Sequence, residues 1–129
     1  FESLAQQGFY NATKCHRLMD SGGFLLQCGD PTGSGMGGPG YRFEDELPKP
    51  GKYAIGSLAM ANAGPNTNTS QFFIMHKDYP LPPSYVIFGH VTKGIEVVDA
   101  LAETPTQRGR DGQMSQPLTP PIMRKVTIR

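Results

Sequence analysis

The sequence predicts a mainly β protein that folds as an antiparallel barrel or sandwich. Short apolar runs alternate with glycine-rich segments, and the 129 residues include 16 Gly and 12 Pro. Helical patterns are few, and the strand–helix–strand alternation that builds parallel sheets is missing. A chain of this length is expected to form a single domain, residues 1–129, around one core. The residues alone leave barrel and sandwich open.

The first part of the chain predicts a helix, two strands and a long loop. Residues 1–8 are typical of the end of a helix, because their apolar residues recur at helical spacing and Gly8 ends the segment. Residues 14–18 and 24–27 predict two short strands joined by a glycine-containing turn. Residues 30–47 show no periodicity, and a loop this long inside a compact domain usually has a function.

The second part predicts three strands around polar loops, at residues 57–61, 72–75 and 85–91. Residues 94–103 have an apolar face at helical spacing and predict a second helix. Residues 104–121 are polar and are expected to be irregular. Residues 122–129 alternate between apolar and polar and predict the last strand.

Composition excludes several classes of function. The formal net charge is +1 and the basic residues are scattered, so no nucleic-acid partner is expected. No apolar run reaches the ~20 residues that span a bilayer. Cys15 and Cys28 do not have the spacing of a zinc site, so no metal is expected. Because these cysteines lie on strands predicted to be antiparallel neighbours, a disulfide and two buried free thiols are both open.

The loop between the strands at 57–61 and 72–75 is the most informative segment. It carries four amide side chains and no charge, namely Asn62, Asn66, Asn68 and Gln71. Such a surface can hydrogen-bond a neutral backbone without attracting an ion, so it favours a peptide as the partner. An ordinary polar hairpin loop would have a similar composition.

Four segments together resemble the cyclophilins, a family of peptidyl-prolyl cis–trans isomerases. Residues 60–73 read MANAGPNTNTSQFF, which is similar to the family signature except that Thr69 stands where glycine is usual. The second segment comprises residues 8–10, 16–18, 24–27 and 29–30, the third comprises 33–40 and 43–46, and the fourth comprises 86–91, and all occur in family order. The residues around Cys15 and Cys28 are most similar to actinobacterial members.

The resemblance implies an eight-stranded antiparallel β-barrel capped by two helices, and it implies which residues are catalytic. Arg17 matches the catalytic arginine, and Gln27 matches the glutamine that holds the substrate backbone and orients that arginine. The reaction needs no cofactor, metal or covalent step. Arg17 would stabilise the twisted prolyl amide. The alternative is a module that binds proline peptides without turnover.

The resemblance also implies a set of substrate-binding residues. The apolar wall of the proline pocket corresponds to Phe24, Leu25, Phe73 and Leu81. Ala61 and Asn62 correspond to positions whose backbone groups pair with the substrate chain. Large apolar residues also pack as plain core, so each wall residue has that second interpretation.

Three features depart from the family pattern. Six residues separate Arg17 from Phe24 where four are usual, so the turn is longer. The chain contains no Trp, and the family's pocket tryptophan falls near Leu81, so cyclosporin binding is expected to be weak. Tyr85 stands where many members have histidine, and tyrosine can still pack and donate a hydrogen bond there.

The chain is expected to be N-terminally truncated relative to the family. It opens at a position that resembles the middle of the first helix, so the family's first two strands are missing before Phe1. About thirty or more further N-terminal residues are expected, the length of two strands with their links. A membrane anchor ahead of them would place the domain on the extracytoplasmic face of a bacterial membrane, and the cytoplasm is the alternative. A monomer that acts on proline-containing peptides and unfolded protein clients is expected.

Overall fold

The computed structural model describes residues 1–49 and 52–129. The fold is mainly β, with antiparallel sheets and two helices, as the sequence predicts. In chain order the elements are α1 (Glu2–Gln6), β1 (Thr13–Lys14), β2 (Arg17–Met19), β3 (Leu25–Cys28), β4 (Ser57–Met60), β5 (Phe72–Met75), β6 (Ile87–His90), α2 (Ile95–Ala102), β7 (Thr106–Arg108), β8 (Met114–Pro117) and β9 (Ile122–Met123). No helix in the described ranges is long and apolar enough to cross a membrane.

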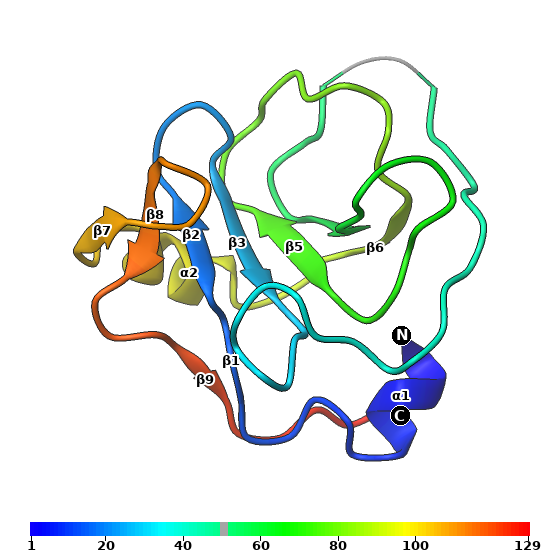
Figure 1. The fold of residues 1–129 in the computed structure, drawn as a ribbon. Coiled ribbons are helices and arrows are strands. Elements are labelled where there is room, and N and C mark those ends of the chain that lie inside the picture. The colour runs from blue at the N-terminus through cyan, green and yellow to red at the C-terminus, as the bar shows by residue number, and fades with distance from the viewer. Residues whose placement is uncertain (50–51) are drawn as a thin grey trace.

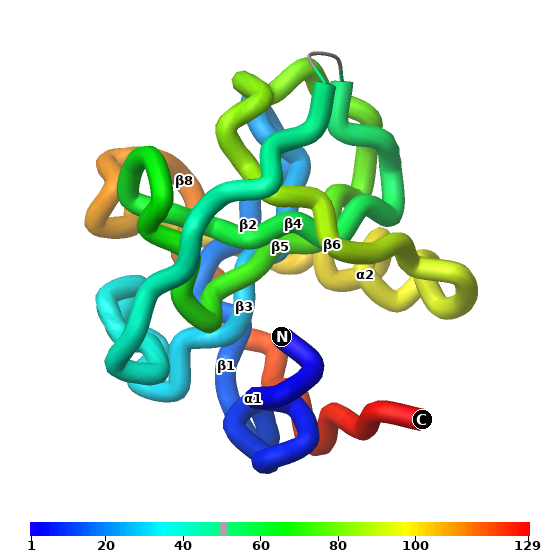
Figure 2. Tube along the Cα trace, turned by 90° about the vertical axis from the view of Figure 1, so that its right-hand side faces the viewer, coloured from blue at the N-terminus to red at the C-terminus, as the bar shows by residue number. Residues whose placement is uncertain are grey.

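A five-stranded antiparallel sheet in the order β2-β3-β5-β4-β6 forms the centre of the molecule (Figure 1). Strands β1 and β9 pair in a second sheet, and β7 and β8 form a hairpin beside β2. Figure 2 shows α2 on one side of the central sheet and β8 on the other. Both views place α1 next to the C-terminal segment, where the Val126 N–H donates to Asn11 Oδ1 at 2.9 Å.

The two faces of the central sheet carry different clusters, because successive strand residues point to opposite sides. One face contains Leu18, Leu26 and Phe72, which pack with Val98 of α2 and with α1 in the larger core. The other face contains Met19, Leu25, Phe73 and Met75 in a smaller cluster. The second cluster lies on the side away from α2 and forms the floor of the candidate site.

Several predicted boundaries are corrected by the structure. The strand expected at residues 14–18 is broken at Cys15 and His16 into β1 and β2, which pair with different sheets. The strand expected at 122–129 is limited to the two residues of β9, which pair with β1. Residues 104–121, expected to be irregular, contain the β7–β8 hairpin. The sequence did not predict this hairpin because its strands are polar and half-exposed. They lack the apolar alternation that marks a buried strand.

Cys15 and Cys28 form a disulfide, with their Cα atoms 4.0 Å apart. Both residues are buried in the larger core. The disulfide joins Cys15, which lies between β1 and β2, to Cys28, the last residue of β3. The pairing interpretation is therefore confirmed, and the free-thiol alternative is wrong for this structure.

Candidate active site

A cavity of about 680 Å³ opens over the face of the sheet that lies away from α2. Its floor comes from β2, β3 and β5, and its sides come from the glycine-rich loop after Asp30, the loop before β6 and the β7–β8 hairpin. The predicted site residues that line it are Arg17, Gln27, Leu25, Ala61, Asn62, Phe73, Leu81 and Tyr85. The structure thus brings together eight of the nine predicted residues.

Strand register explains why Arg17, Gln27 and Phe73 lie together. Arg17 is the register partner of Gln27 across β2 and β3, and Gln27 is the partner of Phe73 across β3 and β5. Register partners in antiparallel strands project to the same face. Two residues along, the same relationship aligns Met19 with Leu25. The floor therefore has a polar edge and an apolar interior.

Phe24 is the predicted residue that the structure does not place in the cavity. It precedes β3 with a φ of +53°. Its ring packs edge-on against His76 and Tyr79, at centroid distances of 5.9 and 5.5 Å. The backbone of Phe24 is left-handed and not extended, and its ring packs with His76 and Tyr79, whereas Leu25 lines the cavity.

Aromatic rings close the apolar end of the cavity. The Tyr85 ring meets Phe73 edge-on, with centroids 5.4 Å apart. Tyr53, which is 2% exposed, fixes Tyr85 by two hydrogen bonds: its hydroxyl donates to Tyr85 O at 2.9 Å and accepts from Tyr85 N–H at 3.1 Å. Burial raises the pKa of Tyr53. Tyr53 was not predicted as a site residue, and a single tyrosine in a loop gives no local signal of such a role.

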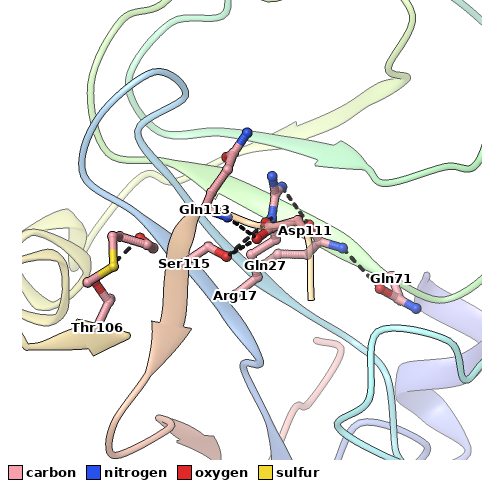
Figure 3. A network of polar contacts seen from close by, with 8 residues as sticks. Arg17, Gln27, Gln71, Thr106, Asp111, Gln113 and Ser115 are labelled. Atoms are coloured by element: carbon pink, nitrogen blue, oxygen red, sulfur yellow. Dashed lines mark hydrogen bonds and ion pairs between the residues drawn. The ribbon is translucent and has the colours of Figure 1, made fainter. Parts of the chain in front are cut away.

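A chain of hydrogen bonds runs along the polar edge (Figure 3). Arg17 Nη1 donates to Gln27 Oε1 at 3.3 Å, and Gln27 Nε2 donates to Gln71 Oε1 at 3.0 Å. Gln71 Nε2 then donates to the carbonyl oxygens of Gly35 and Gly37 at 2.9 and 3.0 Å. Each amide accepts on one side and donates on the other, which fixes the orientation of both glutamines. Gln71 belongs to the amide-rich loop, but its role in the site was not predicted.

The glycine-rich loop owes its shape to the fully buried carboxylate of Asp30. That carboxylate accepts from the N–H groups of Thr32, Gly35 and Gly37 at 2.8, 2.7 and 3.0 Å. Burial acts to raise the Asp30 pKa, but these bonds and one from the Thr32 hydroxyl outweigh it and lower the pKa to about 2. A Cβ atom at residue 37 would lie 2.0 Å from Asp30 Oδ1, so this approach requires glycine.

His16 and Asp111 also line the cavity beside Arg17. Burial lowers the pKa of His16, which keeps its imidazole neutral near pH 7. The Asp111 carboxylate lies 3.1 Å from Arg17 Nε (Figure 3). Asp111 was not predicted, because its hairpin was expected to be irregular.

The backbone next to Asn62 is open to an extended ligand. The Ala61 N–H donates to Gln71 O at 3.0 Å, and the Asn62 side chain donates to Ser84 O at 2.8 Å. Within residues 1–49 and 52–129, no intramolecular hydrogen bond engages the Asn62 N–H. A peptide laid along the cavity could pair with that group.

Metal-ligating side chains do not gather in the part of the chain that the structure describes. Within residues 1–49 and 52–129, no group of three or more His, Cys, Asp or Glu side chains could hold a metal ion.

Comparison with known proteins decides the family. The family model described as "Cyclophilin type peptidyl-prolyl cis-trans isomerase/CLD" matches residues 1–128. The chain belongs to the cyclophilin family. It is 47% identical to "Probable peptidyl-prolyl cis-trans isomerase B" of Mycobacterium tuberculosis, over 92% of this chain and 42% of that protein. The predicted likeness to actinobacterial cyclophilins is thus confirmed, and the chain spans less than half the length of this mycobacterial relative.

Two further cyclophilins are similar over more of their own length. Human "Peptidyl-prolyl cis-trans isomerase-like 1" is 46% identical over 83% of this chain and 68% of that protein. A crystal structure of a Cryptosporidium parvum cyclophilin, determined in the presence of the dipeptide Ala-Pro, superposes with a TM-score of 0.86. It is 38% identical and covers 100% of this chain and 82% of that one.

Proposed function

We propose that this chain catalyses the cis–trans isomerisation of peptide bonds that precede proline. The observation that carries the proposal is the position of Arg17, which Gln27 holds at the edge of a cavity with an apolar floor. Family membership and the Ala-Pro dipeptide present with the related crystal structure support it. The substrates are proline-containing peptides and unfolded protein clients.

The physical task is to lower a rotational barrier. Amide resonance opposes rotation by ~18–20 kcal/mol, and uncatalysed exchange of an X–Pro bond takes tens to hundreds of seconds at about 25 °C. In the twisted transition state the prolyl nitrogen regains its lone pair and can accept a hydrogen bond. A fixed donor aimed at that nitrogen stabilises the transition state more than the planar ground state.

Arg17 supplies this donor. Its guanidinium has five N–H groups in a rigid plane, and Gln27 accepts from only one of them. The proline ring would lie against Phe73, Leu25 and Leu81, where it displaces water that would otherwise stabilise the polar planar amide. The Asn62 N–H would hold the substrate backbone, so that the prolyl nitrogen faces Arg17. No bond to the protein forms, and no proton is transferred.

The same cavity is proposed to bind cyclosporin weakly. Leu81 lines the cavity in the region where other cyclophilins carry a tryptophan, and neither its side chain nor that of Pro80 donates a hydrogen bond.

The deciding experiment is an isomerisation assay on an X–Pro peptide with wild-type protein and Arg17→Ala. Loss of one transition-state donor is expected to lower kcat/KM by about 10²- to 10³-fold. Arg42→Ala is a matched control, because Arg42 is exposed and does not line the cavity. Unchanged turnover in folded Arg17→Ala would contradict the proposed role. Wild-type protein that binds the peptide without accelerating exchange would indicate the binding module instead.

A further inference from the structure

The β7–β8 hairpin brings a carboxylate to the candidate catalytic arginine from far along the chain. Asp111 lies 94 residues after Arg17, yet Arg17 Nε donates to Asp111 Oδ2 at 3.1 Å. Both side chains are about one-third exposed, at 29% for Arg17 and 30% for Asp111. From these contacts we propose that Asp111 is a positioning residue for Arg17. This inference rests on the proposed function.

The Asp111 carboxylate is itself held in place by its own hairpin. The Gln113 N–H donates to Oδ1 at 2.9 Å, and the Ser115 hydroxyl lies 2.8 Å from both carboxylate oxygens. Ser115 is 3% exposed, so its hydroxyl is a fixed partner. Burial acts to raise the Asp111 pKa, but the bonds from Gln113, Ser115 and Arg17 outweigh it and lower the pKa. The residue is therefore an ionised acceptor with a set direction at neutral pH.

Asp111 and Gln27 hold two different edges of the guanidinium. Asp111 accepts from Nε, and Gln27 accepts from Nη1 at 3.3 Å. In the described part of the chain, Nη2 has no hydrogen-bond partner within the protein, and Arg17 lines the cavity. Two acceptors on separate edges of a rigid plane fix its tilt as well as its position. Gln27 alone would leave the plane free to rotate about that single bond.

The β7–β8 hairpin would thus orient the candidate catalytic arginine, a role that its sequence does not indicate. A long arginine side chain loses much rotamer freedom when it is held in one geometry. If Asp111 already restricts the Arg17 side chain before the substrate binds, the guanidinium donor is correctly oriented when the prolyl amide twists. The expected effect of losing Asp111 therefore falls on kcat. The apolar floor formed by Leu25 and Phe73 is untouched, so peptide affinity should not change.

The test is a double-mutant cycle between Arg17→Ala and Asp111→Ala, measured by exchange NMR on an X–Pro peptide. Asp111→Ala is expected to lower kcat/KM by about 5- to 20-fold, the factor for partial loss of arginine ordering. The peptide Kd should stay within about twofold. In the Arg17→Ala background, the same substitution should change kcat/KM by less than about twofold, because a residue that acts through Arg17 has nothing left to position.

Two further variants separate positioning from folding. Asp111→Asn keeps an acceptor for Arg17 Nε and is expected to retain kcat/KM within about threefold of wild type. Asp78→Ala removes the Lys52–Asp78 ion pair of 3.0 Å, whose two residues do not line the cavity, and serves as the matched control. The proton on Arg17 Nε, observed through its ¹⁵N signal, reports the ordering of the side chain directly. This proton should exchange with water faster in Asp111→Ala than in wild type or Asp111→Asn.

The outcomes distinguish this inference from the proposed function. Full activity of Asp111→Ala, with activity lost in Arg17→Ala, overturns the inference and leaves the proposed function standing. An equal loss from Asp111→Ala in both backgrounds also overturns it, because Asp111 would then act independently of Arg17. If Arg17→Ala itself has no effect, the role of Arg17 fails first. If Asp111→Ala does not fold, Asp111→Asn and the Arg17 ¹⁵Nε signal decide: an Asn variant with unchanged structure but activity as low as Arg17→Ala contradicts the inference.

Discussion

Gln27 and Gln71 are 44 residues apart in sequence, and their side chains share a hydrogen bond of 3.0 Å. The bond joins the strand that carries Gln27 to the amide-rich loop before β5. Through the other end of Gln71 it also reaches the glycine-rich wall of the cavity. The orientation of Arg17 therefore also depends on this loop, which is linked to it by hydrogen bonds through Gln71 and Gln27.

Replacing Gln71 should disturb both the loop and catalysis. Gln71→Leu removes the donor for the Gly35 and Gly37 carbonyls at a position that is 8% exposed. The free energy of unfolding should fall by about 1–3 kcal/mol, the cost of leaving buried polar groups unpaired. Since Gln27 also loses its acceptor, kcat/KM should fall by about tenfold. Urea denaturation and the peptide assay measure the two effects. Wild-type stability and activity in this variant would show that the hydrogen-bond chain has no energetic role.

Asp30 should make the protein sensitive to acid. Its pKa is about 2 in the folded protein against 3.8 for the ordinary carboxyl group. A lowered pKa means that the unfolded state binds the proton first, so the stabilisation is fully present above pH 3.8 and is lost as the pH falls toward 2. The difference corresponds to about 2 kcal/mol. Denaturation curves between pH 6 and pH 2 should show this slope for wild type. Asp30→Asn should be less stable at pH 6 and should lack this part of the slope, and an identical slope would contradict the assignment.

The disulfide should stabilise the domain more than it affects the chemistry. It closes a loop with a sequence separation of 13, for which chain entropy predicts about 3 kcal/mol. Dithiothreitol should therefore lower the denaturation midpoint of wild type. The double variant Cys15→Ala/Cys28→Ala should have the lower midpoint from the start and should not respond to the reductant. Because backbone pairing also joins β2 to β3, kcat/KM at low temperature should remain within a few-fold of wild type. A wild-type midpoint that ignores reductant would count against this prediction.

Cyclosporin should bind more weakly than to cyclophilins that contain the pocket tryptophan. The chain has no Trp, so the indole N–H donor is missing. Loss of one hydrogen bond predicts an affinity lower by about 1–2 kcal/mol. Calorimetry on this protein beside a tryptophan-containing member measures the difference, and Leu81→Trp should recover part of it. Equal affinities in the two wild-type proteins would refute the explanation.

Much of the floor of the site could be predicted from local pattern. Once the strands that contain Arg17, Gln27 and Phe73 are recognised, every second residue of each strand is expected on the same face. In the structure these three residues are register partners across β2, β3 and β5. Phe24 does not line the cavity, although the family resemblance placed it in the wall, because its φ of +53° turns the chain just before β3 begins. Neither the resemblance nor the strand predicted at residues 24–27 indicated this conformation, because a positive φ is uncommon outside glycine.

The sequence by itself determined the class of the fold, the family and the residues on the strands of the floor, because these depend on neighbouring residues and on short, ordered motifs. The tertiary structure decided which distant groups meet: Tyr53 with Tyr85, Gln71 with the glycine-rich loop, and Asp111 with Arg17. These contacts join segments whose own patterns are polar or irregular. Which distant residues meet depends on how the whole chain folds, and no local periodicity in the sequence indicates it.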